Sequence, residues 1–258
     1  MVKLISQNLI KKTLPLLTKK GRDKSSLFIV EGKKYVSEIP DNWSIEFYVV
    51  SDSLAHSDLS VYENKACVYI AKDYQFKKLS DTVTPQGVMA ICNKQPRNVE
   101  DMLNGTSLIM LCEALSDPGN VGTLIRAANA ASATGVILTQ GCADLYNPKV
   151  IRAAASSIFH IPCIEVVDAL EIAKLLKNHH ICLAGAHLNG SATPYSVNMT
   201  NPICIMIGNE AHGLTPEMSA QADILIKIPM KANSESLNAA SAGSILLYEA
   251  VRQRLFTN

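Results

Sequence analysis

The sequence predicts an α/β fold in two parts, a small α/β domain followed by a larger domain built on a parallel sheet. Three observations favour this fold class. Short apolar runs of strand length alternate with helical segments along most of the chain. A polar stretch at 94–105, which contains Pro96 and Gly105, separates the two parts and is predicted to be a linker. The length of 258 residues suits two domains, because a domain usually holds about 100–200 residues.

The first domain, residues 1–93, is expected to open with a helix at 6–20 in which Pro15 is an awkward residue. Four strands and three more helices are predicted after it. The strands are SLFIVEG at 26–32, IEFYVV at 45–50, CVYIA at 67–71 and GVMAIC at 87–92. The helices are predicted at 33–39, 52–59 and 72–80.

The second domain, residues 106–258, repeats strand and helix with short connections. The strands are predicted at 108–112, 135–139, 162–166, 181–187, 203–208 and 224–229, and the helices near 120–133, 147–158, 168–177 and 237–254. Such alternation is typical of a parallel sheet that helices cover on both faces. Ligands of open α/β sheets lie outside the carboxyl ends of the strands, so the loops that follow the strands are the candidate functional segments.

Composition narrows the function classes. No apolar run reaches the roughly 18 residues of a membrane helix, and lysines interrupt the N-terminus where a signal core would stand, so a cytoplasmic protein is expected. The seven cysteines contain no CxxC pair, which predicts buried reduced thiols and no metal site. Residues 1–40 carry a net charge of +6 and the remainder −5, a distribution that a contact with a phosphate backbone would use.

Three loops carry polar groups. In the first, at 115–131, Asn120 is expected to cap a helix, and Arg126 follows it by six residues, just under two helical turns, so both are expected to reach one site. In the second, at 203–214, a strand ends at Gly208, where a ligand can approach the backbone, and Glu210 follows. His212 in the same loop fits a structural role better than a catalytic one.

The third loop, at 228–250, follows a strand that ends in Pro229. A polar stretch leads to a helix whose first turn holds Ser236, Leu237 and Asn238, and the small residues at 239–243 allow close packing. No dinucleotide fingerprint, Walker loop, Ser-His-Asp order or metal set occurs, which disfavours a nicotinamide-dependent oxidoreductase. The polar groups suit transfer chemistry in which a cofactor supplies the reactive atom, but the residues alone do not name that cofactor.

The three loops resemble the signature motifs of the SpoU branch of the SPOUT methyltransferases. The matching residues are Asn120 and Arg126 in the first motif, Ile207, Gly208, Glu210, Gly213 and Leu214 in the second, and Ile228, Pro229, Met230, Ser236, Leu237 and Asn238 in the third. The segment 147–162 is also similar to the family. Arg22, Phe28, Val30, Glu31, Gly32 and the run 86–88 resemble the family's ribosomal-protein-like substrate-binding domain.

This resemblance implies an RNA ribose 2′-O-methyltransferase that uses S-adenosylmethionine. It further implies a deep trefoil knot in the second domain, an exception to the general absence of knots, and a homodimer formed through that domain. Ribosomal RNA is the expected substrate; transfer RNA, and an RNA-binding homologue without turnover, remain alternatives. The final helix would be the tail threaded through the knot, with Tyr248 and Leu255 packing either within the subunit or against a partner.

The resemblance also assigns site residues. The catalytic set is Asn120, Arg126, Glu210, Ser236 and Asn238, and the cofactor-binding set is Thr139, Gly141, Ile207, Gly208, Ile228, Pro229, Met230 and Leu237. The RNA-binding set, for which positive charge is the argument, is Lys11, Lys12, Lys19, Lys20, Arg22 and Arg152. Arg126 would help remove the proton of the 2′-hydroxyl, directly or through a neighbouring phosphate; because arginine is normally protonated, the direct route requires a strongly perturbed side chain. Asn120 would hold Arg126 and the substrate, while Glu210 would brace the loops.

Overall fold

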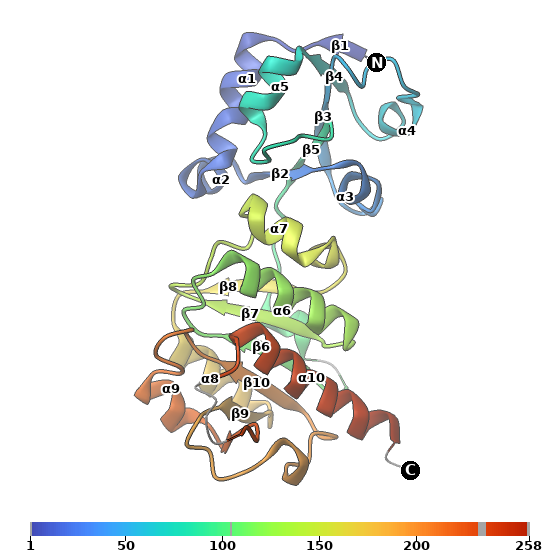
Figure 1. The fold of residues 1–258 in the computed structure, drawn as a ribbon. Helices are drawn as coiled ribbons and strands as arrows, with labels where there is room; N and C mark the ends of the chain where they lie inside the picture. The colour runs from blue at the N-terminus through green and yellow to red at the C-terminus, as the bar shows by residue number, and fades with distance from the viewer. Residues whose placement is uncertain (1, 104, 232–235, 257–258) are drawn as a thin grey trace. The chain divides into compact units, whose positions relative to one another are not determined.

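The computed structural model describes residues 2–103, 105–231 and 236–256, and these residues form two compact units (Figure 1). The first unit holds the chain up to Pro96 together with the later segment Tyr146–Phe159. The second unit holds Arg97–Leu145 and the chain from His160 onward. The predicted α/β class is confirmed, and each unit contains one β-sheet.

The first unit is built on a five-stranded mixed sheet in the order β1-β4-β3-β5-β2. Its strands are β1 (Val2–Leu4), β2 (Leu27–Glu31), β3 (Ile45–Ser51), β4 (Val68–Ala71) and β5 (Val88–Asn93). β5 pairs antiparallel with both β2 and β3, while β4 pairs parallel with β1 and β3. The four predicted strands are present, and the short β1 is an additional strand that was not predicted.

The helix predicted at 6–20 is wrong as a single element. The chain forms α1 (Gln7–Thr13), a 3₁₀ turn η1 (Leu14–Leu17) and then α2 (Lys19–Ser25). Pro15 lies at the start of the 3₁₀ turn, where its missing N–H costs nothing, and Thr18 begins α2 by accepting the N–H of Gly21 at 3.2 Å. Leu16 between the two helices is buried, so the break packs into the core of the unit.

Other helices of the first unit also differ from the prediction. Residues 52–56 form turns rather than a helix, and a four-residue helix, α4 (Ser60–Glu63), follows at 60. α3 (Lys33–Ser37) and α5 (Asp73–Leu79) are present as expected. The helix predicted at 147–158 ends early, as α7 (Pro148–Ala154), because Ala155 and Ser156 adopt left-handed backbone conformations with φ of 46° and 66°. A short 3₁₀ turn, η3 (Ser157–Phe159), completes the segment.

Residues 146–159 join the first unit through aromatic side chains. The ring of Trp43 packs edge-on against Phe159 at 5.0 Å between centroids, and its Nε1–H donates to the Phe159 carbonyl at 3.2 Å. Phe28 packs against Tyr146 at 4.6 Å, and Lys94 lies over the Tyr146 ring. The predicted division at 94–105 does not include the packing of residues 146–159 with the first unit. No local sequence pattern indicates that this segment returns to the first unit.

The second unit is built on a six-stranded sheet in the order β11-β9-β10-β6-β7-β8. Its strands are β6 (Leu108–Cys112), β7 (Gly135–Thr139), β8 (Cys163–Val166), β9 (Cys182–Ala186), β10 (Ile203–Ile207) and β11 (Ile224–Ile226). Every pairing is parallel, as the alternating pattern predicts. The last strand stops at Ile226, so Ile228 and Pro229 lie in the loop after it rather than in the predicted strand.

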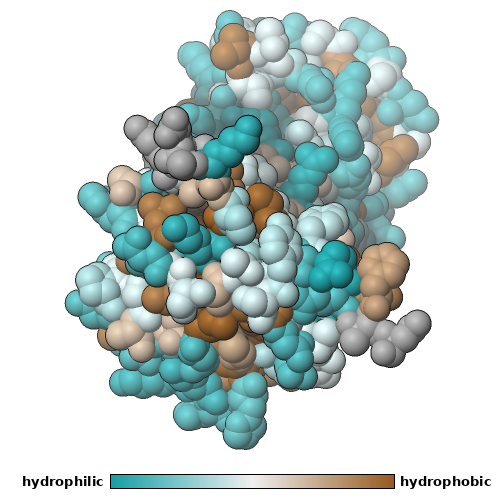
Figure 2. Space-filling model, turned by 60° about the horizontal axis from the view of Figure 1, so that its bottom comes forward, coloured by the Kyte–Doolittle hydropathy of each residue, from teal (hydrophilic) through white to brown (hydrophobic). Residues whose placement is uncertain are grey.

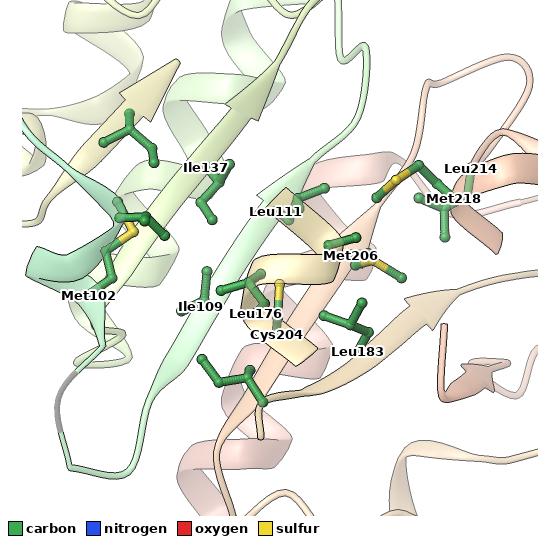
Figure 3. Close-up of a cluster of buried hydrophobic side chains, with 14 residues drawn as sticks. Met102, Ile109, Leu111, Ile137, Leu176, Leu183, Cys204, Met206, Leu214 and Met218 are labelled. Atoms are coloured by element: carbon green, nitrogen blue, oxygen red, sulfur yellow. The ribbon is translucent and has the colours of Figure 1, made fainter. Parts of the chain in front are cut away.

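Helices cover both faces of this sheet (Figure 1). α6 (Pro118–Ala130) and α10 (Ala239–Phe256) pack against each other and against β6 and β10. The other face carries α8 (Ala169–Asn178), α9 (Pro216–Gln221) and the 3₁₀ turn η2 (Val99–Met102). Figure 3 shows the hydrophobic core between the sheet and α8 and α9. In it, side chains of the central strands β6 and β10 point toward Leu176 and Met218; they are Ile109, Leu111, Cys204 and Met206. Alternate strand residues therefore face opposite helical layers.

The face of the molecule drawn in Figure 2 is mostly hydrophilic, with hydrophobic residues in separate patches. Among the described residues, no helix combines the length and the apolar character that a membrane span requires.

The contact between α10 and α6 depends on Gly243. A Cβ atom at this position would lie 2.4 Å from Cδ2 of Leu124 in α6 and 3.3 Å from Ile207. We expect Gly243→Ala to lower the free energy of unfolding of the second unit by about 1–3 kcal/mol, because overpacking outweighs the roughly 1 kcal/mol that alanine gains in helix propensity. Urea unfolding, monitored by circular dichroism, measures the change. A more stable variant would contradict the close packing, since helix propensity alone predicts stabilisation.

Candidate active site

Four loops of the second unit meet at the carboxyl edge of its sheet. They follow β6, β9, β10 and β11, and backbone hydrogen bonds hold them in register beyond the strand ends. The N–H of Glu113 donates to the carbonyl of Ile207 at 2.8 Å, and the N–H of His187 donates to the carbonyl of Ile226 at 2.9 Å. β6 and β10 are neighbours although they are far apart in the sequence, which is the arrangement at which α/β sheets bind ligands.

A cavity of about 300 Å³ lies among the loops after β9, β10 and β11 and the start of α10. This volume falls at the small end of the range for ligand sites, roughly 300–1,000 Å³. Its lining residues are Ala186, His187, Leu188, Asn189, Ile207, Gly208, Asn209, Glu210, Ala211, His212, Gly213, Ile226, Lys227, Ile228, Met230, Ser236, Leu237, Ala239 and Ala242. Apolar walls combined with a few polar groups are typical of a site for a small organic ligand.

The turn after β10 needs glycine at position 208. A Cβ on Gly208 would lie 2.0 Å from the carbonyl carbon of Gly213 and 2.1 Å from the nitrogen of Leu214, so the backbone itself would have to move. Asn209 and Gly213 close the turn by exchanging backbone hydrogen bonds at 3.0 and 2.9 Å. Gly208 therefore holds the wall of the cavity against the next segment of chain.

The side chain of Asn209 fixes the same turn. Its Oδ1 accepts the N–H of Ala211 at 2.9 Å and that of His212 at 3.3 Å. Its Nδ2 donates to the carbonyl of Ala114, in the loop after β6, at 2.9 Å. Asn209 thus joins two loops, although the sequence analysis did not single it out. Its position between Gly208 and Glu210 was the one available signal.

A chain of side-chain hydrogen bonds connects the three predicted motifs. Nδ2 of Asn120 donates to Oε1 of Glu210 at 3.1 Å, and Oδ1 of Asn120 accepts from Nδ2 of Asn238 at 2.9 Å. Oδ1 of Asn238 in turn accepts the N–H groups of Ala240 and Ser241, and so caps α10. The carboxylate accepts hydrogen bonds only, so it fixes the direction in which both amides point.

Glu210 is held in its charged form. Burial raises the pKa of its carboxyl group, but hydrogen bonds from Asn120 and from the backbone N–H groups of Asp117 and Ser116 outweigh that effect, so the pKa lies below its ordinary value. The charge, and the hydrogen bonds that depend on it, are therefore present at neutral pH. They are lost only when the pH falls through this lowered pKa.

The helix that carries Asn120 and Arg126 begins earlier than predicted. Asp117, not Asn120, is the cap of α6; its Oδ1 accepts the N–H of Asn120 at 2.8 Å, and Pro118 starts the helix. The side chain of Asn120 is thereby free for Glu210 and Asn238, and it does not contact Arg126 as the sequence analysis expected. Arg126 is exposed, and its guanidinium group has no hydrogen-bond or ion-pair partner within the described parts of the chain.

Thr139 and Gly141, predicted to bind cofactor, do not line the cavity. Oγ1 of Thr139 accepts the N–H of Ala114 at 3.1 Å, and a Cβ on Gly141 would lie 3.1 Å from that of Ala114. Ala114 has a φ of 50°, a conformation that alanine rarely adopts, and Asn209 holds its carbonyl. The observed role of Thr139 and Gly141 is thus to support the loop after β6, because they lie at the end of the neighbouring strand.

Most of the other predicted site residues come together. The lining of the cavity includes the side chains or backbone of Ile207, Gly208, Glu210, Ile228, Met230, Ser236 and Leu237. Pro229 is not among them. The lining also includes residues that were not predicted, because β9 ends beside β10 and β11 ends beside β9; they are His187, Leu188, Asn189 and Lys227. Strand order, which spacing does not reveal, was needed to find them.

The predicted RNA-binding residues divide into exposed and buried groups. Lys11, Lys19 and Lys20 are exposed on α1 and α2, and Lys12 is exposed but pairs with Glu46 at 3.1 Å. Arg22 corrects the prediction: its side chain is only 2% exposed, and its Nη1 donates to the carbonyl of Leu16 at 2.7 Å. Arg22 therefore links α2 to the 3₁₀ turn η1, and its buried side chain cannot reach a phosphate.

Arg152, the remaining residue predicted to bind RNA, is half-buried on α7. Its Nη2 pairs with Oδ2 of Asp81 at 2.8 Å.

No group of three or more histidine, cysteine, aspartate or glutamate side chains arranged to hold a metal ion occurs among the residues that the structure describes.

Family models match most of the chain. Residues 107–248 match the SpoU rRNA Methylase family, and residues 7–90 match the MRM3-like substrate binding domain. A curated relative from Bacillus subtilis, 23S rRNA (guanosine(2553)-2′-O)-methyltransferase RlmP, is 32% identical over 235 residues, which cover 90% of this chain and 92% of that protein. The 23S rRNA (uridine(2479)-2′-O)-methyltransferase of Streptomyces viridochromogenes is 37% identical over 152 residues, 57% of this chain and 53% of that protein.

Solved structures are similar over the full length. The SpoU methyltransferase AviRb from Streptomyces viridochromogenes, in complex with the cofactor AdoMet, superposes with a TM-score of 0.90 at 25% identity and covers 98% of this chain and 100% of its own. The AdoMet-bound rRNA methyltransferase from Sinorhizobium meliloti gives a TM-score of 0.84 at 26% identity, covering 100% and 99%. The resemblance inferred from the three motifs is confirmed: the chain belongs to the SpoU rRNA methylase family.

Proposed function

We propose that this chain transfers a methyl group from S-adenosylmethionine to a ribose 2′-hydroxyl of ribosomal RNA. The observation that carries the proposal is one cavity lined by residues of the second and third family motifs, to which the hydrogen bonds of Glu210 and Asn238 join Asn120 of the first motif. Two relatives named as 23S rRNA 2′-O-methyltransferases and two similar structures that contain AdoMet support the substrate and the cofactor.

The cavity fits such a cofactor. Ile207, Ile226, Ile228 and Leu237 offer apolar walls for a flat base, and Gly208 allows the wall after β10 to pack directly on the backbone of Gly213. The bound group would supply a methyl carbon attached to a positively charged sulfur, which is electrophilic without further activation. The protein then has to orient the ribose oxygen in line with that carbon and remove one proton.

Arg126 and Asn120 are the residues that we assign to the ribose. The proton of the 2′-hydroxyl would pass to a phosphate of the RNA that the guanidinium group of Arg126 holds, or to Arg126 itself in its deprotonated guanidine form, as the oxygen–methyl bond forms and the methyl–sulfur bond breaks. Its exposed guanidinium group, which has no partner among the described residues, is accessible to RNA. Asn120 would position the ribose, because its own side chain is held in place by the hydrogen bond to Glu210.

The first unit would bind the RNA. Its exposed lysines on α1 and α2 supply positive charge that can attract the phosphates of RNA of any nucleotide sequence. The family model for a substrate binding domain covers this segment. We assign residues 1–93 to substrate binding and 106–258 to the cofactor and catalysis, joined by 94–105, although residues 146–159 of the second part pack with the first unit. A ribosomal substrate would place the enzyme in the cytoplasm.

We also assign a trefoil knot and a homodimer to the second unit, as the family resemblance implies. α10 supports the dimer because it leaves Ile245, Tyr248 and Leu255 exposed at 40%, 52% and 70%. A second copy of the chain is a suitable cover for these side chains, since exposed apolar patches mark protein interfaces. Tyr248 and Leu255 therefore fit the second of the two packing roles that the sequence left open.

Replacement of Arg126 by alanine should reduce methylation of ribosomal RNA by at least about a hundredfold, the scale of a lost proton-transfer group. Binding of S-adenosylmethionine, measured by titration calorimetry, should remain unchanged because Arg126 does not line the cavity. Transfer of a labelled methyl group to RNA, followed by mass spectrometry of the nucleosides, measures the activity. Unchanged turnover of the variant would exclude a catalytic role for Arg126. If the wild-type protein methylates transfer RNA but not ribosomal RNA, transfer RNA is the substrate instead. A wild-type protein that binds RNA without methylating any would instead be a silent homologue.

Replacement of both Lys19 and Lys20 by glutamine should weaken RNA binding and reduce the slope of log affinity against log salt by about one to two, since each phosphate contact contributes roughly 0.7–0.9. Filter binding at several salt concentrations measures both quantities. The matched control replaces Lys77 and Lys78, an exposed pair on α5 of the same unit. An equal loss in the control would show that overall charge, rather than the α2 surface, binds the RNA.

Replacement of Tyr248 by glutamate should convert the dimer into a monomer, because a buried unpaired charge destabilises an apolar interface. Size-exclusion chromatography with light scattering measures the mass. Tyr195→Glu provides the control, since Tyr195 is also exposed in the second unit but lies on the 3₁₀ turn η4 (Pro194–Ser196). A wild-type monomer, or a dimer that survives in the Tyr248 variant, would contradict the proposed interface.

A further inference from the structure

His187 follows directly after β9 and forms part of the cavity wall. Its backbone is fixed on both sides, because its N–H donates to Ile226 at 2.9 Å and its carbonyl accepts from Gly190 at 3.1 Å. The imidazole is fixed as well: Nδ1 accepts the backbone N–H of Asn189 at 3.1 Å. A ring nitrogen that accepts a hydrogen bond carries no proton, so the proton of the neutral ring is on Nε2.

Nε2–H is then the one hydrogen-bonding group of His187 that remains to be used. Within the described residues, it has no partner. Two other polar groups at the cavity, Asn209 and Glu210, are already occupied by the hydrogen bonds that hold their loops. His212 and Lys227 are exposed, whereas His187 is half-buried. His187 thus combines a fixed ring, partial burial and an unused donor.

The chemistry around His187 selects the part of a ligand that it can meet. Its neighbours in the lining include the apolar side chains of Leu188 and Ile226, which suit a flat base better than a charged amino-acid group. A donor beside apolar walls requires an acceptor in the plane of that base, and the ring nitrogens of adenine are such acceptors. A neutral donor also avoids the repulsion that a second positive charge would exert on a sulfonium group.

We propose that His187 positions the cofactor by donating its Nε2–H to a ring nitrogen of the adenine of S-adenosylmethionine. This inference rests on the proposed function, because it assumes that the cavity is the cofactor site. His187 acts by binding, not by proton transfer, so its replacement should raise KM for the cofactor and leave kcat nearly unchanged.

The test uses three replacements of His187 and titration calorimetry with S-adenosylmethionine. His187→Ala and His187→Asn should bind about tenfold more weakly, the effect of one lost neutral hydrogen bond. Asparagine can still accept the N–H of Asn189 but has no donor at the position of Nε2, whereas His187→Gln places an amide there and should bind nearly as wild type. His179→Ala is the matched control, because His179 is exposed and precedes the amino end of β9.

Deaza analogues of S-adenosylhomocysteine identify the acceptor. Replacement of one adenine nitrogen by carbon should weaken binding to the wild-type protein and have no effect on binding to His187→Ala. Equal affinities of His187→Ala and wild type, or losses of equal size from every deaza analogue in both proteins, would overturn the inference. A wild-type protein that does not bind S-adenosylmethionine would instead refute the proposed function.

Discussion

The carboxylate of Glu210 is the group on which the arrangement of the candidate site depends. It accepts hydrogen bonds from the loop after β6 and from Asn120, and its charge fixes which way each amide in the chain to Asn238 is turned. The first turn of α10 is thereby fixed relative to α6 and β10. One ionised group thus aligns α6, the loop after β10 and the start of α10, which are far apart in the sequence. The last two of these segments form part of the cavity wall.

Much of the fold could be predicted because the parallel sheet imposes a simple pattern. Its strands are buried on both faces, so they are short continuous apolar runs, and each return crossing requires a helix. Prediction failed where long-range packing decided the local structure. Leu16 turns into the core between α1 and α2, and left-handed Ala155 ends α7, although the apolar pattern in both places is compatible with a continuous helix.

The motif residues of the site could be predicted, but several of their partners could not. Asn120, Glu210 and Asn238 meet as the resemblance implied, whereas Thr139 holds Ala114 instead of the cavity. His187 escaped notice because one histidine after a strand is not a pattern. Arg22 was misassigned because net charge along the sequence does not distinguish an exposed guanidinium group from a buried one. Burial and strand order, which are properties of the folded chain, decided each of these cases.

The return of residues 146–159 to the first unit has a consequence for synthesis of the protein. Trp43 and Phe28 complete their aromatic contacts only with Phe159 and Tyr146, residues that a ribosome adds more than a hundred positions later. The first unit therefore cannot finish its core as soon as its own continuous segment has emerged, as N-terminal domains generally do. The strands β6 and β7 of the second unit are already outside by then, so the second unit begins to emerge before the first can complete its core, and the synthesis of the two units overlaps.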